Sequence, residues 1–173
     1  MAGEIDEPVA VRPYDPSWPE RFARERTRLA DALGPLARGI EHIGSTAVPG
    51  LDAKPVVDVL GVDGPLDAHP ALAAVEALGY ESFGEAGVPG RRYFRRRAAG
   101  DDVNVHVVAH GGEVWADNLL LRDHLRAHPD DARAYAEPKR RAAAAAPDSL
   151  LRYSDLKADV VRALVARARA ERG

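Results

Sequence analysis

IEHIGSTAVPGLDAKPVVDVLGV, residues 40–62, is the stretch that decides the fold of this chain. Its hydrophobic pattern predicts a strand over residues 39–43 and a second strand over residues 55–62. Gly44 and Ser45 lie between them, where a small residue and a hydroxyl residue are typical of a tight turn. We therefore expect two strands joined by this turn and a short irregular or helical bridge.

Three kinds of polar group come together in this stretch. Gly44 and Ser45 offer N–H and hydroxyl donors, Lys54 offers an ammonium, and Asp58 places a carboxylate in the middle of an apolar strand. A carboxylate at such a position is costly unless it is paired. Backbone donors at a turn, together with a cation, are typical of phosphate binding. The stretch thus predicts a site that handles a nucleotide or another phosphate compound.

Outward from this stretch, the sequence alternates between strand-like and helix-like patterns. The expected helices cover residues 17–33, 66–78 (with its proper start near His69), 115–127, 129–146 (with a kink or break at Pro138) and 155–170. The expected strands cover residues 9–14 at an edge, 80–83, and an antiparallel hairpin over 91–97 and 103–108. Ser17, with Glu20, and Ser154 are predicted helix caps. This order predicts an α+β fold, a mixed sheet flanked by helices with a helical C-terminal third.

Length and composition limit the classes of function. The 173 residues suit one domain over 1–173, with residues 1–8 as a flexible tail. A net charge of −3 argues against a general nucleic-acid partner, and the absence of cysteine excludes a disulfide frame or thiolate metal site. The N-terminus lacks a signal-peptide pattern and no apolar run approaches 18 residues, so we expect a cytoplasmic protein with no membrane partner.

Lysine is rare in this chain. Of 24 basic residues 21 are Arg, and the three lysines are Lys54, Lys139 and Lys157. A lysine offers a compact, rotatable ammonium in place of the planar guanidinium of arginine. We interpret Lys54 as functional because it lies in the organising stretch, and Lys139 and Lys157 as further ligand contacts.

Histidines and arginines supply further candidate site residues. His42 and His106 would form a metal site with Asp58 if both strands face one cleft, a set better suited to Zn²⁺, Mn²⁺ or Fe²⁺ than to Mg²⁺; alternatively both are structural.

Alternation places Arg91 and Arg95 on one face of their strand and Arg92 on the other, and Arg92 is the preferred phosphate ligand because it lies nearest the Gly-rich loop. The alternative is a solvated edge strand. Arg122 and Arg126 share a helix face, as part of a basic pocket or of a salt-bridged surface.

The motifs HIGSTAVPG (42–50) and AKPVVDV (53–59), with YDPSWPERF upstream, resemble the GrpB family. The likeness continues through GRRYF, VHVV, LRDHLRAHPDDARAYAEPKR and YSDLKADVV, and so covers nearly the whole chain. It implies a nucleotidyltransferase-like fold and a relationship to a domain attached to some dephospho-CoA kinases. The broader nucleotidyltransferase pattern has a second acid two residues after the first, where this chain has Leu60, so the carboxylate set for Mg²⁺ is incomplete.

Two hypotheses follow. In the first, the chain is a nucleotidyltransferase that binds a nucleoside triphosphate; Asp58 holds a divalent metal ion, Mg²⁺ or a transition metal, and His106 joins Asp58 in the catalytic set. Its predicted substrate contacts are Gly44, Ser45, Thr46, Lys54, Arg92, Arg122, Lys139 and Lys157. In the second, the chain is a non-catalytic nucleotide-binding, CoA-binding or accessory domain that has lost the second acid. A third use of the cleft, with His106 as a base in amide or ester formation, has no distinctive support.

Overall fold

A computed structural model describes residues 4–61 and 69–173. The elements are, in chain order, α1 (Trp18–Leu33), η1 (Gly34–Leu36), β1 (Ile40–Ile43), η2 (Ser45–Ala47), β2 (Val56–Gly61), α2 (Pro70–Ala77), β3 (Glu81–Ser82), β4 (Arg91–Arg96), β5 (Asp102–Val108), α3 (Glu113–Ala127), α4 (Pro129–Ala145) and α5 (Leu150–Arg172).

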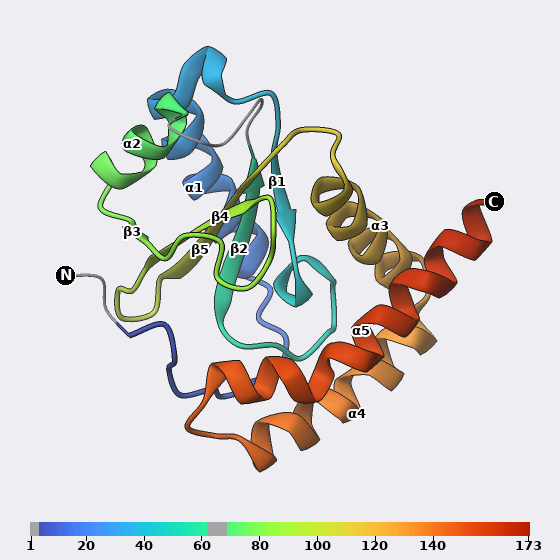
Figure 1. Cartoon of the computed structure of the whole chain (residues 1–173). Coiled ribbons are helices and arrows are strands. Elements are labelled where there is room, and N and C mark those ends of the chain that lie inside the picture. Colours follow the sequence, from blue (N-terminus) through green and yellow to red (C-terminus); the bar gives the residue numbers. More distant parts are fainter. Residues whose placement is uncertain (1–3, 62–68) are drawn as a thin grey trace.

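The described strands form one mixed sheet in the order β1-β2-β5-β4-β3 (Figure 1). Strand β2 pairs in parallel with β5, and the other neighbours are antiparallel. The pairing sets Asp58 directly beside Asn104, because these two residues are partners in the parallel register. Side chains of partnered residues project to the same face, so Asp58, Asn104 and His106 share one face of the sheet.

The opposite face of the sheet is closed by α1 and α2. Val103, Val105 and Val107 alternate inward along β5, as predicted, and they pack with Val57 and Phe94. The helices contribute Trp18, Leu29, Leu33, Ala71 and Val75 to the same core. Each of these side chains is at most 4% exposed, so this face is sealed from solvent.

Helices α3, α4 and α5 pack beside the strands and beneath them in the view of Figure 1. Val48 and Leu51, in the segment between β1 and β2, pack against Leu125 of α3 and Tyr135 of α4. Near the end of β5, Val108 packs with Ile43 and Trp115. The C-terminal third therefore holds the segment 44–55 in place and brings α5 close to the Asp58 face.

The predicted fold class is confirmed: the chain is an α+β protein with a mixed sheet, flanking helices and a helical C-terminal third. The hairpin of β4 and β5 pairs as predicted, with Phe94 opposite Val105. Helix α2 begins after His69, whose side chain accepts a hydrogen bond from the Ala71 amide. The predicted turn at residues 63–65 lies outside the described residues.

Several local predictions were wrong. The expected edge strand over residues 9–14 is reduced to a single bridge between Arg12 and Ala53. Of the kink or break expected at Pro138, the break does not occur, because helix α4 continues through this residue. The last helix begins a turn before Ser154, because Ser149 caps it by accepting from the Arg152 amide.

Two further details concern the ends of the chain and the first helix. Ser17 stands at the N-cap of α1 without a capping side-chain hydrogen bond, so the predicted capping box does not form. Residues 4–8, expected in a flexible tail, are tied down: Ser149 donates to Asp6, and Arg95 donates to the Ile5 carbonyl. No helix in the described ranges combines the length and apolar character needed to cross a membrane.

Candidate functional site

Asp58 is the carboxylate at the centre of the candidate site. Asn104 Nδ2 donates to Asp58 Oδ1 over 2.9 Å, and His106 Nε2 lies 2.9 Å from the same oxygen. Burial opposes ionisation of this group, but the hydrogen bond from His106, the charge of Lys54 and the hydrogen bond from Asn104 outweigh it. The pKa of Asp58 therefore lies well below its usual range. Its side chain keeps 23% exposure, so the charge is held at the edge of solvent.

His106 is fixed from both sides. Arg91 Nη1 lies 3.3 Å from His106 Nδ1, and a guanidinium can only donate. Nδ1 therefore accepts, and Nε2 carries the hydrogen that it donates to Asp58. Arg91 is itself anchored, because it donates to the carbonyls of Glu85 and Ala86. Both ring nitrogens of His106 are occupied, so this histidine orients Asp58 and has no free lone pair for a base or a metal ligand.

The turn at Gly44 touches the carboxylate. A Cβ atom at Gly44 would lie 2.9 Å from Asp58 Oδ2, and the residue has φ +73°. Both observations require glycine: the backbone conformation is one that side chains rarely adopt, and the space is taken by the carboxylate oxygen. The turn and Asp58 therefore adjoin, with Ser45 half-buried beside them. The sequence prediction placed these two features in one site, and the geometry is compatible with that expectation.

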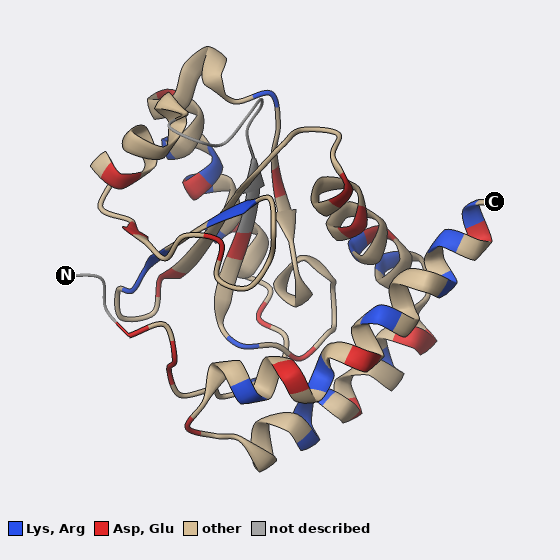
Figure 2. Cartoon of the chain, in the orientation of Figure 1, with Lys and Arg blue, Asp and Glu red and all other residues tan. Residues whose placement is uncertain are grey.

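The three lysines of the chain meet at one place. Lys54 Nζ lies 5.7 Å and Lys157 Nζ 4.7 Å from the centre of the Tyr153 ring. Lys139 is 1% exposed, lies over the Tyr135 ring and donates to the Asp52 carbonyl over 2.5 Å. These residues come from the loop before β2, from α4 and from α5, elements whose charged residues Figure 2 marks. The three ammoniums are thus brought together from distant parts of the sequence.

Electrostatics link the lysines to one another and to Asp58. Burial, followed by repulsion from Lys157 and Lys54, lowers the pKa of Lys139 to about 6. Burial and repulsion from Lys54 lower the pKa of Lys157 to about 7, and burial also lowers that of Lys54. The negative charge of Asp58 acts in the opposite direction on all three. Across the described ranges, no carboxylate is within ion-pair distance of these ammoniums.

The predicted set of His42, Asp58 and His106 as metal ligands does not form. His42 projects to the α1 face, where its ring stacks on Phe22 at 4.7 Å and its Nε2 lies 2.9 Å from Thr46 Oγ1. Burial lowers its pKa to about 4. Strand alternation explains the error, because Ile43 rather than His42 is the β1 partner of Asp58. His42 and Thr46 therefore stabilise the turn at Gly44 from the α1 face of the sheet.

Two predicted arginine contacts also lie elsewhere. Arg92 shares the face of Phe94 and lies 3.4 Å from Glu85, so the preferred ligand was on the wrong side of β4. Arg91 occupies the Asp58 face instead, because it lies two residues from Tyr93, the β4 partner of His106. Arg122 is engaged by Glu41 at 2.7 Å and Asp123 at 2.9 Å, the salt-bridged alternative.

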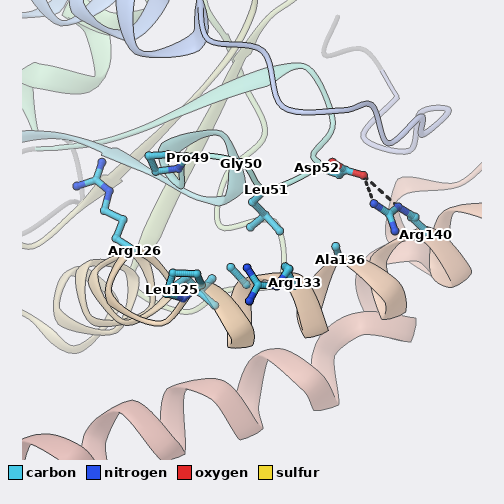
Figure 3. A pocket seen from close by; sticks show the side chains of 11 residues that line it. Pro49, Gly50, Leu51, Asp52, Leu125, Arg126, Arg133, Ala136 and Arg140 are labelled. Atoms are coloured by element: carbon cyan, nitrogen blue, oxygen red, sulfur yellow. Dashed lines mark hydrogen bonds and ion pairs between the residues drawn. The ribbon is translucent and has the colours of Figure 1, made fainter.

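A pocket of about 710 Å³ opens between the segment after η2 and helices α3 and α4 (Figure 3). Its floor is apolar, with Leu51, Leu125 and Ala136, and its rim carries Arg126 and Arg140. Both guanidiniums have partners: Arg126 donates to the Ala47 carbonyl, and Arg140 pairs with Asp52. This pocket does not include Asp58 or any of the three lysines in its lining.

Comparison with known proteins agrees with the resemblance seen in the sequence. The family model described as GrpB protein matches residues 8–167. A UPF0157 protein of Pseudomonas aeruginosa is 42% identical over 169 residues, covering 94% of this chain and 69% of its own length. The crystal structure of the conserved protein GrpB from Enterococcus faecalis matches with a TM-score of 0.83 and 33% identity, covering 94% of this chain and 98% of that chain.

One relative is a named enzyme of greater length. A dephospho-CoA kinase of Mycolicibacterium paratuberculosis is 30% identical over 176 residues, which cover 87% of this chain and 43% of the kinase. The likeness thus extends over less than half of that enzyme.

Proposed function

The chain belongs to the GrpB family, and from that premise we propose that it binds a phosphate-bearing ligand of the nucleotide or CoA type. The phosphates lie between the turn at Gly44 and Ser45 and the ammoniums of Lys54 and Lys157. The observation that carries this proposal is the convergence of the three lysines beside Asp58, with no carboxylate partner for any of them among residues 4–61 and 69–173.

Phosphate suits this site for a physical reason. Burying an ammonium without a counter-charge costs several kcal/mol, and a cluster of three adds mutual repulsion. An anion with several oxygens offsets the desolvation and the repulsion at once. Each lysine ammonium can donate a charge-assisted hydrogen bond to a phosphate oxygen. Burial and mutual repulsion lower the pKa values of Lys139 and Lys157, and a bound anion would oppose both effects.

The residues do not fit the paired Mg²⁺ ions of standard nucleotidyl transfer. Asp58 Oδ1 already accepts hydrogen bonds from Asn104 and His106, which leaves Oδ2. Position 60, where a second acid is expected, is Leu60. Even with the amide oxygen of Asn104, which accepts no hydrogen bond from the described residues, the set offers a single negative charge. One carboxylate and one amide oxygen do not provide the ligands that a pair of Mg²⁺ ions requires.

Nucleotidyl transfer is a second candidate, favoured by the contact between Gly44 and Asp58 Oδ2. A turn of backbone donors against an ionised aspartate is the arrangement that such transfer uses to place a triphosphate beside its acid. Incubation with nucleoside triphosphates, with and without Mg²⁺, separates the two functions. Pyrophosphate release that is lost in Asp58→Asn would establish transfer, whereas tight binding without release would leave binding as the function.

Isothermal titration calorimetry with ATP, CoA and pyrophosphate tests binding directly. We expect at least one of them to bind wild-type protein, and Lys54→Met and Lys157→Met each to weaken that binding by about tenfold or more. Arg141→Met is the matched control, because Arg141 is exposed on α4 and its ion pair with Glu137 is long, at 3.9 Å. Absence of heat with all three compounds, or unchanged affinity in both lysine variants, would contradict the proposal.

A further inference from the structure

The junction of α3, α4 and α5 holds a cluster of histidines and acids that the proposed function does not use. His124 lies near the end of α3, His128 joins α3 to α4, and Glu171 lies in the last turn of α5, which runs beside the other two helices (Figure 1). One ligand atom from each of the three lies within 4.8 Å of the others. The imidazole rings are stacked, with centres 4.2 Å apart.

The outer nitrogen of each histidine is already committed. His124 Nε2 lies 2.7 Å from Asp131 Oδ2, and His128 Nδ1 lies 2.9 Å from the His124 carbonyl oxygen. Carboxylate and carbonyl oxygens only accept, so each of these nitrogens carries the hydrogen. In the neutral form of both rings, the remaining nitrogens, Nδ1 of His124 and Nε2 of His128, present lone pairs to Glu171.

Three electron-pair donors thus face one another. His124 Nδ1 and His128 Nε2 are each 3.3 Å from the same oxygen, Oε2 of Glu171. Nothing else in the described ranges donates a hydrogen bond between them, and the nearest cation, Arg167, lies 3.7 Å from the other oxygen, Oε1. Two neutral imidazole lone pairs and a carboxylate repel at this separation unless a proton or a metal cation lies among them.

The separations match those of a tetrahedral zinc site. Bonds of about 2.0–2.2 Å to nitrogen and oxygen at tetrahedral angles place neighbouring ligand atoms about 3.4 Å apart. Two edges of the His124, His128 and Glu171 triangle are 3.3 Å, and the side chain of His128 is 40% exposed, so its ring can adjust the third edge. Asp131 on the far nitrogen of His124 supplies the carboxylate that typically supports a metal-bound histidine.

We propose that His124 Nδ1, His128 Nε2 and Glu171 Oε2 bind a divalent transition-metal ion of the Zn²⁺ type. Imidazole and carboxylate ligands favour Zn²⁺, Co²⁺ or Ni²⁺ over the hard ion Mg²⁺. Three protein ligands leave the fourth position for water. Such an ion joins the last turn of α5 to the junction of α3 and α4, and so fixes the helix that also carries Lys157.

Titration of chelator-treated, full-length protein with Zn²⁺ tests this site. We expect one equivalent to bind, Glu171→Gln and His128→Gln to abolish that binding, and Asp131→Asn to weaken it by about 10–100-fold. His110→Gln and Glu137→Gln are controls, because both residues are exposed and neither belongs to the cluster. Co²⁺ in place of Zn²⁺ should give the visible absorption of a tetrahedral nitrogen and oxygen site in wild type and in both controls.

A structural readout guards against loss of folding in the variants. Amide hydrogen exchange of the last turns of α5 should slow when Zn²⁺ is added to wild type and should not respond in Glu171→Gln. The proposal is overturned if wild type binds no equivalent of Zn²⁺, or if Glu171→Gln and His128→Gln bind it as wild type does. Binding with unchanged hydrogen exchange in α5 would overturn the part of the proposal that assigns the ion to the helix junction.

Discussion

Buried charges around Glu25, on the α1 face of the sheet, are paired, whereas those of the three lysines beside the Asp58 face are not. On the α1 face, Glu25 is 4% exposed and is met by Arg96 at 3.1 Å, by Arg28 at 3.5 Å and by the Tyr80 hydroxyl. Arg96 also pairs with Asp101 at 3.0 Å. On the Asp58 face, Lys54 and Lys157 lie over the Tyr153 ring and Lys139 lies over the Tyr135 ring, and no carboxylate of the described residues is in ion-pair contact with them.

We interpret the paired charges as stabilising the fold and the unpaired lysines as binding a ligand. Where each buried charge has a partner, removing one partner costs stability and leaves the other exposed to the full desolvation penalty. Where like charges are gathered without partners, the folded state carries the cost itself, which is typical of functional sites. The variants below should therefore move stability and ligand binding in different directions on the two faces.

The largest change in stability is expected at Glu25, on the α1 face of the sheet. Glu25→Gln leaves the guanidinium of Arg96 with a single carboxylate partner, so the free energy of unfolding should fall by about 3–5 kcal/mol. Urea denaturation at pH 7 measures this change. Binding of the phosphate ligand to the folded protein should remain as in wild type, and a loss of affinity equal to that of Lys54→Met would erase the distinction between the faces.

Substitution in the lysine cluster should raise the free energy of unfolding, whereas substitution of Glu25 should lower it. Lys139→Met removes a buried ammonium whose pKa is about 6 in the folded state, against an ordinary value of 10.5. Between about pH 6 and pH 10.5 the unfolded chain holds a proton on Lys139 that the folded chain does not, and this difference lowers the stability of the wild-type protein at pH 7. We expect the variant to be more stable by about 2–3 kcal/mol and to bind phosphate ligands less tightly. A destabilised variant in the same urea experiment would argue that Lys139 serves the fold.

The turn against Asp58 can be tested with a matched pair of glycines. Gly44 and Gly90 both have positive φ, at +73° and +79°, but an added Cβ meets Asp58 Oδ2 only at Gly44. We expect Gly90→Ala to cost about 1 kcal/mol and Gly44→Ala about 1–2 kcal/mol more than that, with loss of ligand binding in Gly44→Ala alone. Equal losses of stability in the two variants, with binding retained, would mean that the contact with Asp58 is unimportant.

How far the sequence alone leads can be seen at particular residues. Gly44, Lys54 and Asp58 could be grouped because they are close in sequence, and alternation along β5 correctly separated Val105 from His106. Position along one strand does not decide which face meets a neighbour, so Arg92 was preferred over Arg91 and His42 was assigned to the wrong side. The meeting of Lys139 and Lys157 with Lys54 depends on the packing of α4 and α5, for which only the rarity of lysine gave a signal.

The smallest effect is expected when the affinity for a phosphate ligand is measured at different pH values. Lys157, with a pKa of about 7, is largely charged at pH 6 and largely neutral at pH 8. An anion favours the charged form, so binding takes up protons and affinity should fall by about tenfold between pH 6 and pH 8. Calorimetry in buffers of different ionisation enthalpy measures the proton uptake directly. Affinity that stays constant or rises with pH would contradict the involvement of Lys157.

Nuclear magnetic resonance of the lysine side chains shows whether the three lysines form one cluster, without carboxylate partners, that binds a phosphate ligand. The chain has three lysines, so a spectrum of isotope-labelled lysine Cε groups contains three signals to follow. The account predicts that two of them titrate with pKa values of about 6 and about 7, and that a bound phosphate ligand raises both. Three signals that titrate near 10.5 and do not respond to ATP, CoA or pyrophosphate would contradict it.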